Sequence, residues 1–359
     1  MVDYRITLNE TNVVKGIAIC AMLWHHLFFE HPEYGIIAFK LSLTSKMCVA
    51  LFVFLSGYGM AVQYQKKNPF FTERLRSKGQ IMQNWGQFLL HRLTKFYLNY
   101  WIVFFLVVPL GIFVFSRTLV DAYGSEKPLW ISFFLDVLGM QVFKSYNITW
   151  WINRLFIVLW LSFPILYWSM RSKAVSGLML ILLYLNPGSV LLKLNFLAFG
   201  LSSWLLSFAL GIFIAVNGNF INRVLNKINR YAVLMLAIIA TIVFLYMRNH
   251  YVLHCFLGVK SDPFIAIFLS LAIVSICRLS KRKISILGFV GKHSMNMYLI
   301  HTFIFSYFFH DFIYGFKNPC LIFLVLFSTS LLLSLAFETL KKIIGFYRFQ
   351  TKIINLINV

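Results

Sequence analysis

Charged side chains are scarce in this chain, and acidic ones are the scarcest. Asp, Glu, Lys and Arg make up 12% of its 359 residues, and only 11 residues are acidic, whereas about a quarter of a typical soluble domain is charged. Hydrophobic residues make up 60% of the chain. A water-soluble domain of this composition could not cover its own surface, so the composition excludes a soluble globular protein.

The sequence also lacks closely spaced cysteines. Its cysteines are scattered along the chain, at Cys20, Cys48, Cys255, Cys277 and Cys320. Their spacing suits neither a disulfide framework nor a metal site, so we interpret them as small buried hydrophobic residues and expect no bound metal. A cleavable signal peptide is not expected either, because the first apolar run contains two histidines and no small-residue cleavage site follows it.

Long apolar runs dominate the sequence instead. They are about 17 to 25 residues long, which lets a helix cross a hydrocarbon core of roughly 30 Å. We predict ten transmembrane spans, at residues 13–29, 45–64, 94–116, 150–170, 174–192, 199–217, 231–248, 262–278, 285–310 and 319–340. The predicted fold is therefore all-α: a polytopic membrane helical bundle of about ten transmembrane helices, forming a single domain over residues 1–359 with no appended soluble domain.

Two apolar stretches depart from this regular pattern. The stretch 128–145 is short and is interrupted by Asp136, so we predict a re-entrant or interfacial segment there. The fifth predicted span is the weakest, because it is broken by Asn186-Pro187-Gly188.

The basic residues are distributed asymmetrically over the predicted loops. The net charge of +22 would direct a soluble protein to nucleic acid, but in a membrane protein Lys and Arg gather on the cytoplasmic side. Alternate loops and span ends hold 22 Lys and Arg on one side against nine on the other. We therefore predict that both termini are cytoplasmic, that the protein lies in the cell membrane as a multi-pass protein, and that it binds no nucleic acid.

Ionisable residues inside the first span are candidates for function, because a charge at mid-bilayer is costly. Lys15 and His26 are eleven residues apart, almost three helical turns, so they share one face, with His26 about 16 Å further out. His25 points about 100° away from that face. A neutral imidazole can accept a proton from a hydroxyl, so His26 could act as a general base. The alternative is that His25 and His26 only anchor the helix end at the interface.

Four other segments carry polar or small residues at notable positions. Ser56, Gly57 and Gly59 lie among aromatics, where small residues let helices approach closely. Arg92 and Lys95 lie one turn apart and could bind phosphates or phospholipid headgroups, or act as ordinary cytoplasmic anchors. Trp150 and Trp151 are typical of an interfacial aromatic belt. Arg154 lies about one turn inside it, and His301 lies well within the ninth span, where helix-to-helix hydrogen bonding is the alternative explanation.

Taken together, six segments resemble the acyltransferase-3 family of bacterial membrane acyltransferases, which modify cell-surface polysaccharides. The matching segments are VVKGIAICAMLWHHLF (13–28), CVALFVFLSGYGM (48–60), HRLTKFYLNYW (91–101), WWINRLFIVLWLSFPIL (150–166), SFALGIFIA (207–215) and LGFVGKHSMNMYLIHTFIF (287–305). They occur in order over most of the chain.

The resemblance implies roles for particular residues. His26 is implied as the general base, and Lys15 as a positioning or donor-binding residue. Donor-binding roles are implied for Arg92 and Lys95, which would hold the phosphates of acyl-coenzyme A, and for Ser56 and Gly57. Supporting or acceptor-binding roles are expected of His25, Trp151, Arg154, Tyr298 and His301.

This sequence departs from the family pattern at a few positions. Lys15 and Lys95 replace the commoner arginines, so bidentate contacts are lost there. Asn12 stands where an aspartate is frequent, and Phe156 and Ile157 replace an acidic pair that some members carry. These changes bear on the geometry of donor binding.

The function that we expect is transfer of an acetyl group from cytoplasmic acetyl-coenzyme A to a sugar hydroxyl of a capsular or other surface polysaccharide, or of its lipid-linked precursor. Acetyl-coenzyme A would be a substrate, and no bound cofactor is expected. A transporter or flippase for a lipid-linked sugar is the alternative, although the sequence shows no inverted repeat. A membrane sensor or scaffold is a third hypothesis, but it would not require a base and a basic rim on one helix.

Overall fold

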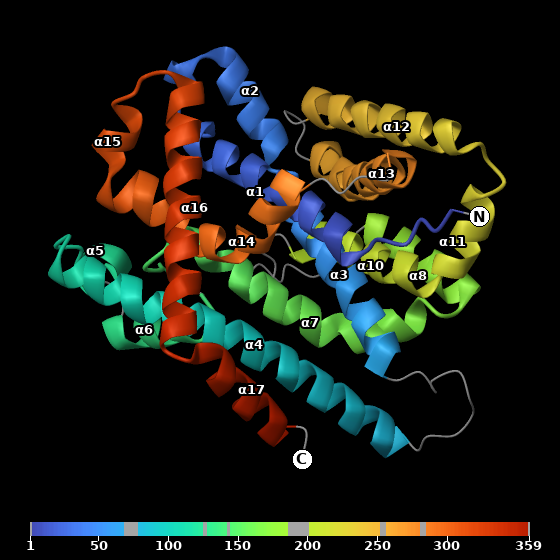
Figure 1. Cartoon of the computed structure of the whole chain (residues 1–359), viewed down its shortest axis with the longest axis horizontal. Helices are drawn as coiled ribbons and strands as arrows, with labels where there is room; N and C mark the ends of the chain where they lie inside the picture. Colours follow the sequence, from blue (N-terminus) through green and yellow to red (C-terminus); the bar gives the residue numbers. More distant parts are fainter. Residues whose placement is uncertain are drawn as a thin grey trace. The chain divides into compact units, whose positions relative to one another are not determined.

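The structure is a computed structural model, and it describes residues 2–67, 78–124, 128–141, 144–185, 201–251, 256–280 and 285–357. Every regular element in these ranges is helical, without a strand, which confirms the predicted all-α class. The helices are labelled in Figure 1. The chain forms two compact units: unit 1 is Met1–Phe71 with Ser162–Ser294, and unit 2 is Thr72–Leu161 with Met295–Val359. The single domain expected from the sequence stays a prediction. The predicted break at 186–188, Cys255 and the basic residues 281–283 lie outside the described ranges.

Unit 1 is built from eight complete α-helices and the 3-10 helix η1 (Pro32–Tyr34) in the described residues, together with the end of α7 and the start of α14. Its helices are α1 (Leu8–Phe28), α2 (Ile36–Ser45), α3 (Cys48–Lys67), α8 (Lys173–Leu185), α10 (Leu201–Val216), α11 (Gly218–Leu225), α12 (Arg230–Tyr251) and α13 (Phe256–Ser280). The most extensive packing joins α12 to α13 and α3 to α10. Helix α1 packs on α2, α3 and α13, so it lies at the centre of the unit.

Glycines allow the helices of unit 1 to approach each other closely. A side chain on Gly16 of α1 would overlap the backbone of Leu287, and one on Gly291 of α14 (Ser285–Thr302) would overlap the backbone of Asn12. The two helices therefore cross with their backbones in contact, as small residues permit in membrane proteins. This crossing fixes the part of α1 that carries Lys15.

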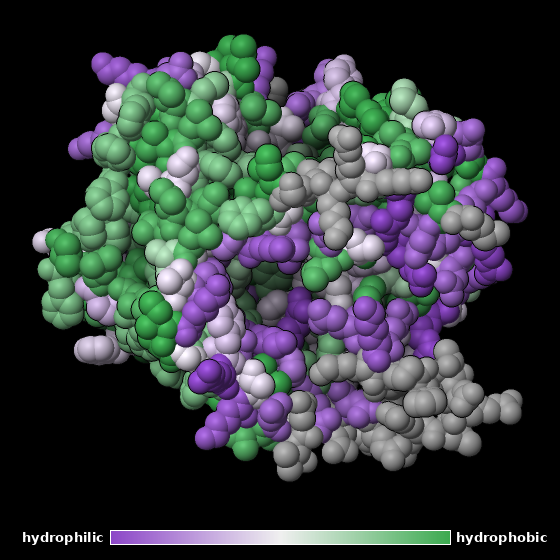
Figure 2. Space-filling view, viewed as in Figure 1, coloured by the Kyte–Doolittle hydropathy of each residue, from purple (hydrophilic) through white to green (hydrophobic). Residues whose placement is uncertain are grey.

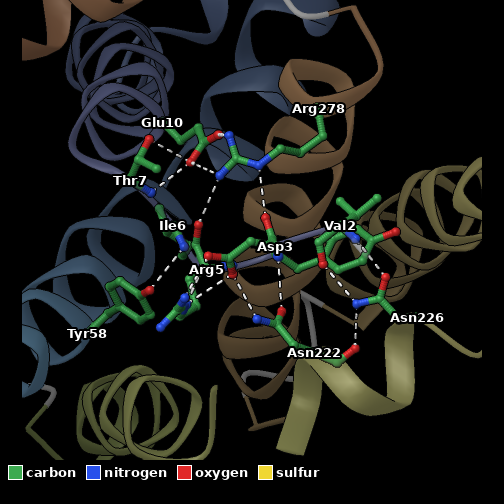
Figure 3. A network of polar contacts seen from close by, with 11 residues as sticks. Val2, Asp3, Arg5, Ile6, Thr7, Glu10, Tyr58, Asn222, Asn226 and Arg278 are labelled. Carbon is green, nitrogen blue, oxygen red and sulfur yellow. Dashed lines mark hydrogen bonds and ion pairs between the residues drawn. The ribbon is translucent and has the colours of Figure 1, made fainter. Parts of the chain in front are cut away.

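The N-terminal segment is fastened across one end of unit 1 (Figure 3). The Tyr4 N–H donates to the Asn222 side chain of α11 at 2.9 Å, and the Tyr58 hydroxyl of α3 accepts a backbone N–H of the same segment at 3.0 Å. Arg278 of α13 forms an ion pair at 2.7 Å with Glu10, whose side chain is buried in the first turn of α1. Three helices are thus tied to the start of α1.

Unit 2 contains the remaining helices of the described residues. They are α4 (Lys78–Phe113), α5 (Leu119–Tyr123), α6 (Leu129–Val137), the 3-10 turn η3 (Ile148–Trp150), most of α7 (Trp151–Ser169), the end of α14, the π-helix η5 (Phe303–Phe308), α15 (His310–Tyr314), α16 (Pro319–Ile343) and α17 (Phe346–Ile357). Helix α17 packs on α4 and α16, and η5 and α15 pack on α16.

A buried carboxylate organises the short segment predicted to be re-entrant or interfacial. Helix α6 has nine residues, too few to cross a membrane, and ends next to Asp136. One oxygen of Asp136 accepts hydrogen bonds from the Tyr123 hydroxyl at 3.0 Å and the Tyr146 N–H at 2.7 Å. The Tyr100 hydroxyl of α4 donates to the backbone carbonyl of the same aspartate at 2.6 Å. These contacts bring Tyr123, Asp136 and Tyr146 together beside α4.

Six helical segments of the described residues are long and apolar enough to cross a membrane: Ile36–Lys66, Asn84–Phe113, Ile148–Ser169, Arg230–His250, Lys260–Ser280 and Pro319–Ile343. Helices α10 and α11, bent by 77°, add a seventh if they are one span. These segments fall on seven of the ten predicted spans and confirm a polytopic membrane bundle. The predicted spans 13–29 and 285–310 are helical, but their polar residues keep them out of this set.

The exposed apolar side chains of the membrane helices are compatible with a surrounding lipid bilayer. Only 17% of the apolar window of α12 and 22% of that of α16 are buried inside the protein, against 50% in α13. A space-filling view shows a nearly continuous hydrophobic surface over α15 and α16 (Figure 2). Lipid would cover this surface, because a patch of this extent is not stable in water.

Cysteines agree only in part with the interpretation drawn from the sequence. Cys48 and Cys277 are buried, and Cys20 is partly buried. Cys320 is exposed, contrary to the expectation, because it lies in the first turn of α16, where the Asn318 side chain caps the helix.

Candidate functional site

The predicted base and its partner cation lie on one face of α1, as the helical spacing indicates. Lys15 and His26 are both partly buried. Between them on the same face lie Ile19 and Met22, whose side chains are 0% and 1% exposed. Protein atoms rather than lipid therefore cover this face, which places an amine and an imidazole at the edges of an apolar strip.

His25 has a structural contact of its own. It is buried, and its Nδ1 lies 2.8 Å from the carbonyl oxygen of Ser42 in the last turn of α2. A carbonyl oxygen can only accept, so Nδ1 carries the hydrogen. The His25 and His26 rings are 5.1 Å apart. His25 thus ties α1 to α2 directly beside His26, in keeping with the supporting role predicted for it.

A second basic side chain caps the same end of α2. Arg248 of α12 donates to the carbonyl of Leu43 at 2.5 Å and forms an ion pair with Asp262 of α13 at 2.6 Å. The two charged side chains are 3% and 0% exposed. The last carbonyls of a helix lack partners and carry partial negative charge, which suits a cation. Arg248 and His25 together satisfy two of them.

This ion pair was not predicted from the sequence. Arg248 and Asp262 are 14 residues apart and lie on different helices, α12 and α13. The pair is nonetheless part of what holds α2 against His25.

The Ser56-Gly57 motif lies on α3, at its crossing with α10. A side chain on Gly57 would overlap the backbone oxygen of Phe208, and one on Gly211 of α10 would overlap that of Phe54. The structure therefore shows close helix packing at Gly57, which is the alternative to a donor-binding role for the motif. Ser56 is partly exposed on the neighbouring position, and the donor-binding role of the motif stays a prediction.

We expect Gly57→Ala to destabilise the protein, because its methyl group would force α3 and α10 apart. Overpacking of this kind costs about 1–3 kcal/mol. Gly59→Ala, two residues along the same helix, is the matched control, because a Cβ there meets no atom within 4 Å. Thermal unfolding in detergent should show a lower midpoint for Gly57→Ala only. Equal midpoints for the two variants would contradict the packing assignment.

The predicted donor-binding pair lies on α4 of unit 2. The Arg92 guanidinium lies 4.6 Å from the ring centroid of Trp160, so it is held by a cation–π contact. Lys95, almost one turn further along, is exposed. Its carbonyl accepts a hydrogen bond from Asn99 at 2.8 Å. One cation of the pair is thus oriented by an aromatic ring, and the other lies on an exposed position.

The start of α7 and the end of α14 are joined by a buried hydrogen-bond network. The Tyr298 hydroxyl donates to the Thr149 carbonyl at 2.8 Å, and Thr149 and Thr302 hydroxyls are 3.0 Å apart. The Trp150 indole donates to the Leu299 carbonyl at 3.2 Å. The turn η3 is therefore clamped onto α14.

His301 is fully buried beside this network. Its Nδ1 lies 2.7 Å from the Tyr298 carbonyl, and its Nε2 lies 3.3 Å from the Thr302 hydroxyl. Both ring nitrogens therefore have partners in their own helix, which suits a positioning role. On α7, Trp151 is partly buried and Arg154 donates to the Gln141 carbonyl. The role of Trp151 and Arg154 in binding the sugar acceptor stays a prediction.

A buried polar cluster in unit 2 was not predicted as a group. The amine of Lys341, 1% exposed, donates to Glu338 at 2.9 Å, Asn99 at 3.0 Å and Asn296 at 3.1 Å. All three protons of the Lys341 amine therefore have partners inside the protein. The spacing of three residues between Glu338 and Lys341 was a usable signal for a helical ion pair.

Residues 8–339, nearly the whole chain, match the acyltransferase-3 family, which is described as an acyltransferase domain. The chain belongs to this family. It is a membrane acyltransferase, as the six resembling segments indicated. Searches of curated proteins and of solved structures gave no significant match. Of the predicted residues of this acyltransferase, unit 1 holds Lys15, His25, His26, Ser56 and Gly57, and unit 2 holds Arg92, Lys95, Trp151, Arg154, Tyr298 and His301.

Proposed function

We propose that this acyltransferase transfers an acetyl group from acetyl-coenzyme A to a sugar hydroxyl of a surface polysaccharide or its lipid-linked precursor. The observation that best supports the proposal is the face of α1. Lys15 and His26 lie on it together, and it is covered by protein, since Ile19 and Met22 between them are buried. An interfacial anchor would not require a base and a cation on one protein-covered face.

His26 would act as the general base. Its imidazole takes the proton of the sugar hydroxyl as the oxygen attacks the thioester carbonyl carbon. The carbon–sulfur bond then breaks, and the coenzyme A thiolate leaves and receives the proton from the imidazolium. The products are the acetyl ester and free coenzyme A. The histidine returns to its neutral form, so no other reactant is required.

Donor binding would depend on the basic residues of α4 and on Lys15. Coenzyme A carries a pyrophosphate and a further phosphate, which are natural ligands for arginine and lysine. The stacking of Arg92 on Trp160 supports this assignment, because it holds one cation in a defined place.

The proposal is tested by the chemistry of the purified protein. It should release coenzyme A from acetyl-coenzyme A in the presence of a surface glycan, and NMR of the glycan should show new O-acetyl signals. Cells lacking the gene should lose the same signals. Purified protein that neither hydrolyses nor transfers acetyl would contradict the proposal and favour the transporter hypothesis.

Arg92→Gln should weaken acetyl-coenzyme A binding about tenfold or more, because a hydrogen bond to a charged group contributes about 1.5–3 kcal/mol. Isothermal titration in detergent measures the affinity. Arg171→Gln is the control, since it removes one positive charge from an exposed position at the end of α7. Unchanged affinity in Arg92→Gln, Lys95→Gln and Lys15→Ala would remove the donor-site assignment.

A further inference from the structure

Helix α17 lies beyond the residues that match the family. The match ends at residue 339, and α16 qualifies as a membrane-spanning segment up to Ile343. The chain turns at Gly345, whose φ of +69° lies in the left-handed region that favours glycine. Helix α17 begins at Phe346, so it follows directly after a helix that is long and apolar enough to cross a membrane.

One side of α17 packs against the rest of unit 2. Phe346 and Ile354 are buried, and α17 packs on α4. The Tyr347 hydroxyl donates to the Glu338 carboxylate of α16. Burial, together with that carboxylate, raises the pKa of Tyr347 to about 12, so the hydroxyl keeps its proton at neutral pH. The helix is therefore held in one orientation against the end of α16.

The other side of α17 is amphipathic and exposed. Phe349 and Leu356, seven residues apart and thus on one side of the helix, are 55% and 69% exposed. Arg348 and Lys352, one turn apart, are exposed beside them.

A shallow groove of about 690 Å³ runs along this side. Its described lining consists of two cations, two hydroxyl groups, an amide and one apolar side chain, and includes no carboxylate: Tyr347, Arg348, Thr351, Lys352, Asn355 and Leu356. Figure 2 shows hydrophilic residues over α17 next to the hydrophobic surface of α16. The groove thus offers cations and hydrogen-bond donors beside a surface that lipid would cover.

We propose that α17 is an interfacial helix that binds the headgroups of anionic phospholipids. Phe349 and Leu356 would enter the boundary between headgroups and acyl chains, and Arg348 and Lys352 would contact a lipid phosphate in the groove. A basic amphipathic helix next to a transmembrane span has this affinity, because apolar insertion and attraction to anionic lipid act together. The helix is fixed to α4 and α16, so a bound lipid would also be held against the transmembrane helix bundle.

The test uses the full chain in detergent, titrated with phosphatidylglycerol or phosphatidylcholine and examined by native mass spectrometry. The wild type should retain phosphatidylglycerol preferentially. Arg348→Gln/Lys352→Gln should lower that preference about tenfold or more, since each basic residue near the surface contributes severalfold. Arg171→Gln/Lys173→Gln, which removes two exposed charges elsewhere, should retain it. Unchanged retention in the α17 variant, or the same loss in both variants, would overturn the proposal.

Acetyl-coenzyme A also carries phosphates, so the same variants are titrated with it. Lipid binding predicts an unchanged affinity for acetyl-coenzyme A in Arg348→Gln/Lys352→Gln. A fall in that affinity would overturn the proposal and assign the groove to the donor. The lipid measurement does not require catalysis, so its outcome is separate from that of the acetyl-transfer assay.

Discussion

Replacing His26 with alanine is expected to lower the rate of acetyl transfer by about 100- to 10,000-fold, the range that a positioned general base contributes. The fold should survive, because His26 is only partly buried and its loss leaves the His25 contact with α2 intact. The rate of coenzyme A release in the presence of glycan gives the effect directly. In cells, NMR of the surface polysaccharide should show its O-acetyl signals lost.

His31→Ala is the matched control for this variant. His31 follows α1 directly and pairs with Glu33 at 2.7 Å, with 30% of its side chain exposed. Its replacement removes an imidazole near the same end of α1 without touching the face that carries His26, so transfer should continue at the wild-type rate. Full acetylation by His26→Ala, expressed at the wild-type level, would exclude His26 as the base.

Replacing Asp262 with alanine is expected to cost about 3–5 kcal/mol of stability, because it leaves the charge of Arg248 buried without its counter-ion. The pair is almost completely excluded from solvent, so water cannot compensate. Chemical unfolding in detergent measures the loss, and poor yield of folded protein would accompany it. The double variant Arg248→Met/Asp262→Leu should recover much of the stability, since replacing both charges with apolar groups is often nearly neutral.

The ion pair between Arg5 and Asp3 is the control for burial. Its atoms are also close, at 2.8 Å, but both side chains are about half exposed. Hydrogen bonding to Arg5 holds the pKa of Asp3 well below its usual range, so the pair acts at neutral pH and is lost as the carboxyl protonates in acid. Exposed ion pairs contribute little to the free energy of unfolding, so Asp3→Asn should barely change the unfolding midpoint at neutral pH. Equal effects of Asp262→Ala and Asp3→Asn would contradict the importance of burial.

The membrane helices could be predicted from sequence because lipid leaves the backbone no other partner than itself. Runs such as 231–248 and 319–340 are therefore both apolar and helical. Helix α1 was predicted despite Lys15 and its histidines, because the apolar run 13–29 that contains them is long enough to cross a membrane. Its polar residues are tolerated because protein covers the face that carries them.

Contacts between helices could not be predicted, because they depend on which elements meet. Helix α2 was not predicted, because it lies almost entirely between the predicted spans 13–29 and 45–64. It is stabilised by hydrogen bonds to its last carbonyls from His25 of α1 and Arg248 of α12. Neither pairing has a fixed sequence spacing, in contrast to Glu338 and Lys341, whose spacing could have been used.

The contacts of small residues could be predicted from sequence only in part. The packing explanation for Gly57 was available from sequence, because glycine among aromatics favours close helix contact. The part of α10 that packs against Gly57 could not be predicted from sequence, because the contact depends on the crossing of two helices that are distant in sequence. The same limit applies to the buried cluster around Lys341, whose acceptors come from α4, α14 and α16.

The exposed thiol at the start of α16 gives cell biologists a native chemical handle. Cys320 lies at the end of a membrane-spanning helix, whereas Cys48 and Cys277 are shielded. A maleimide that does not cross bilayers could reach such a thiol from one compartment only. The orientation of this acyltransferase in living cells is thus open to direct labelling without introducing a foreign residue.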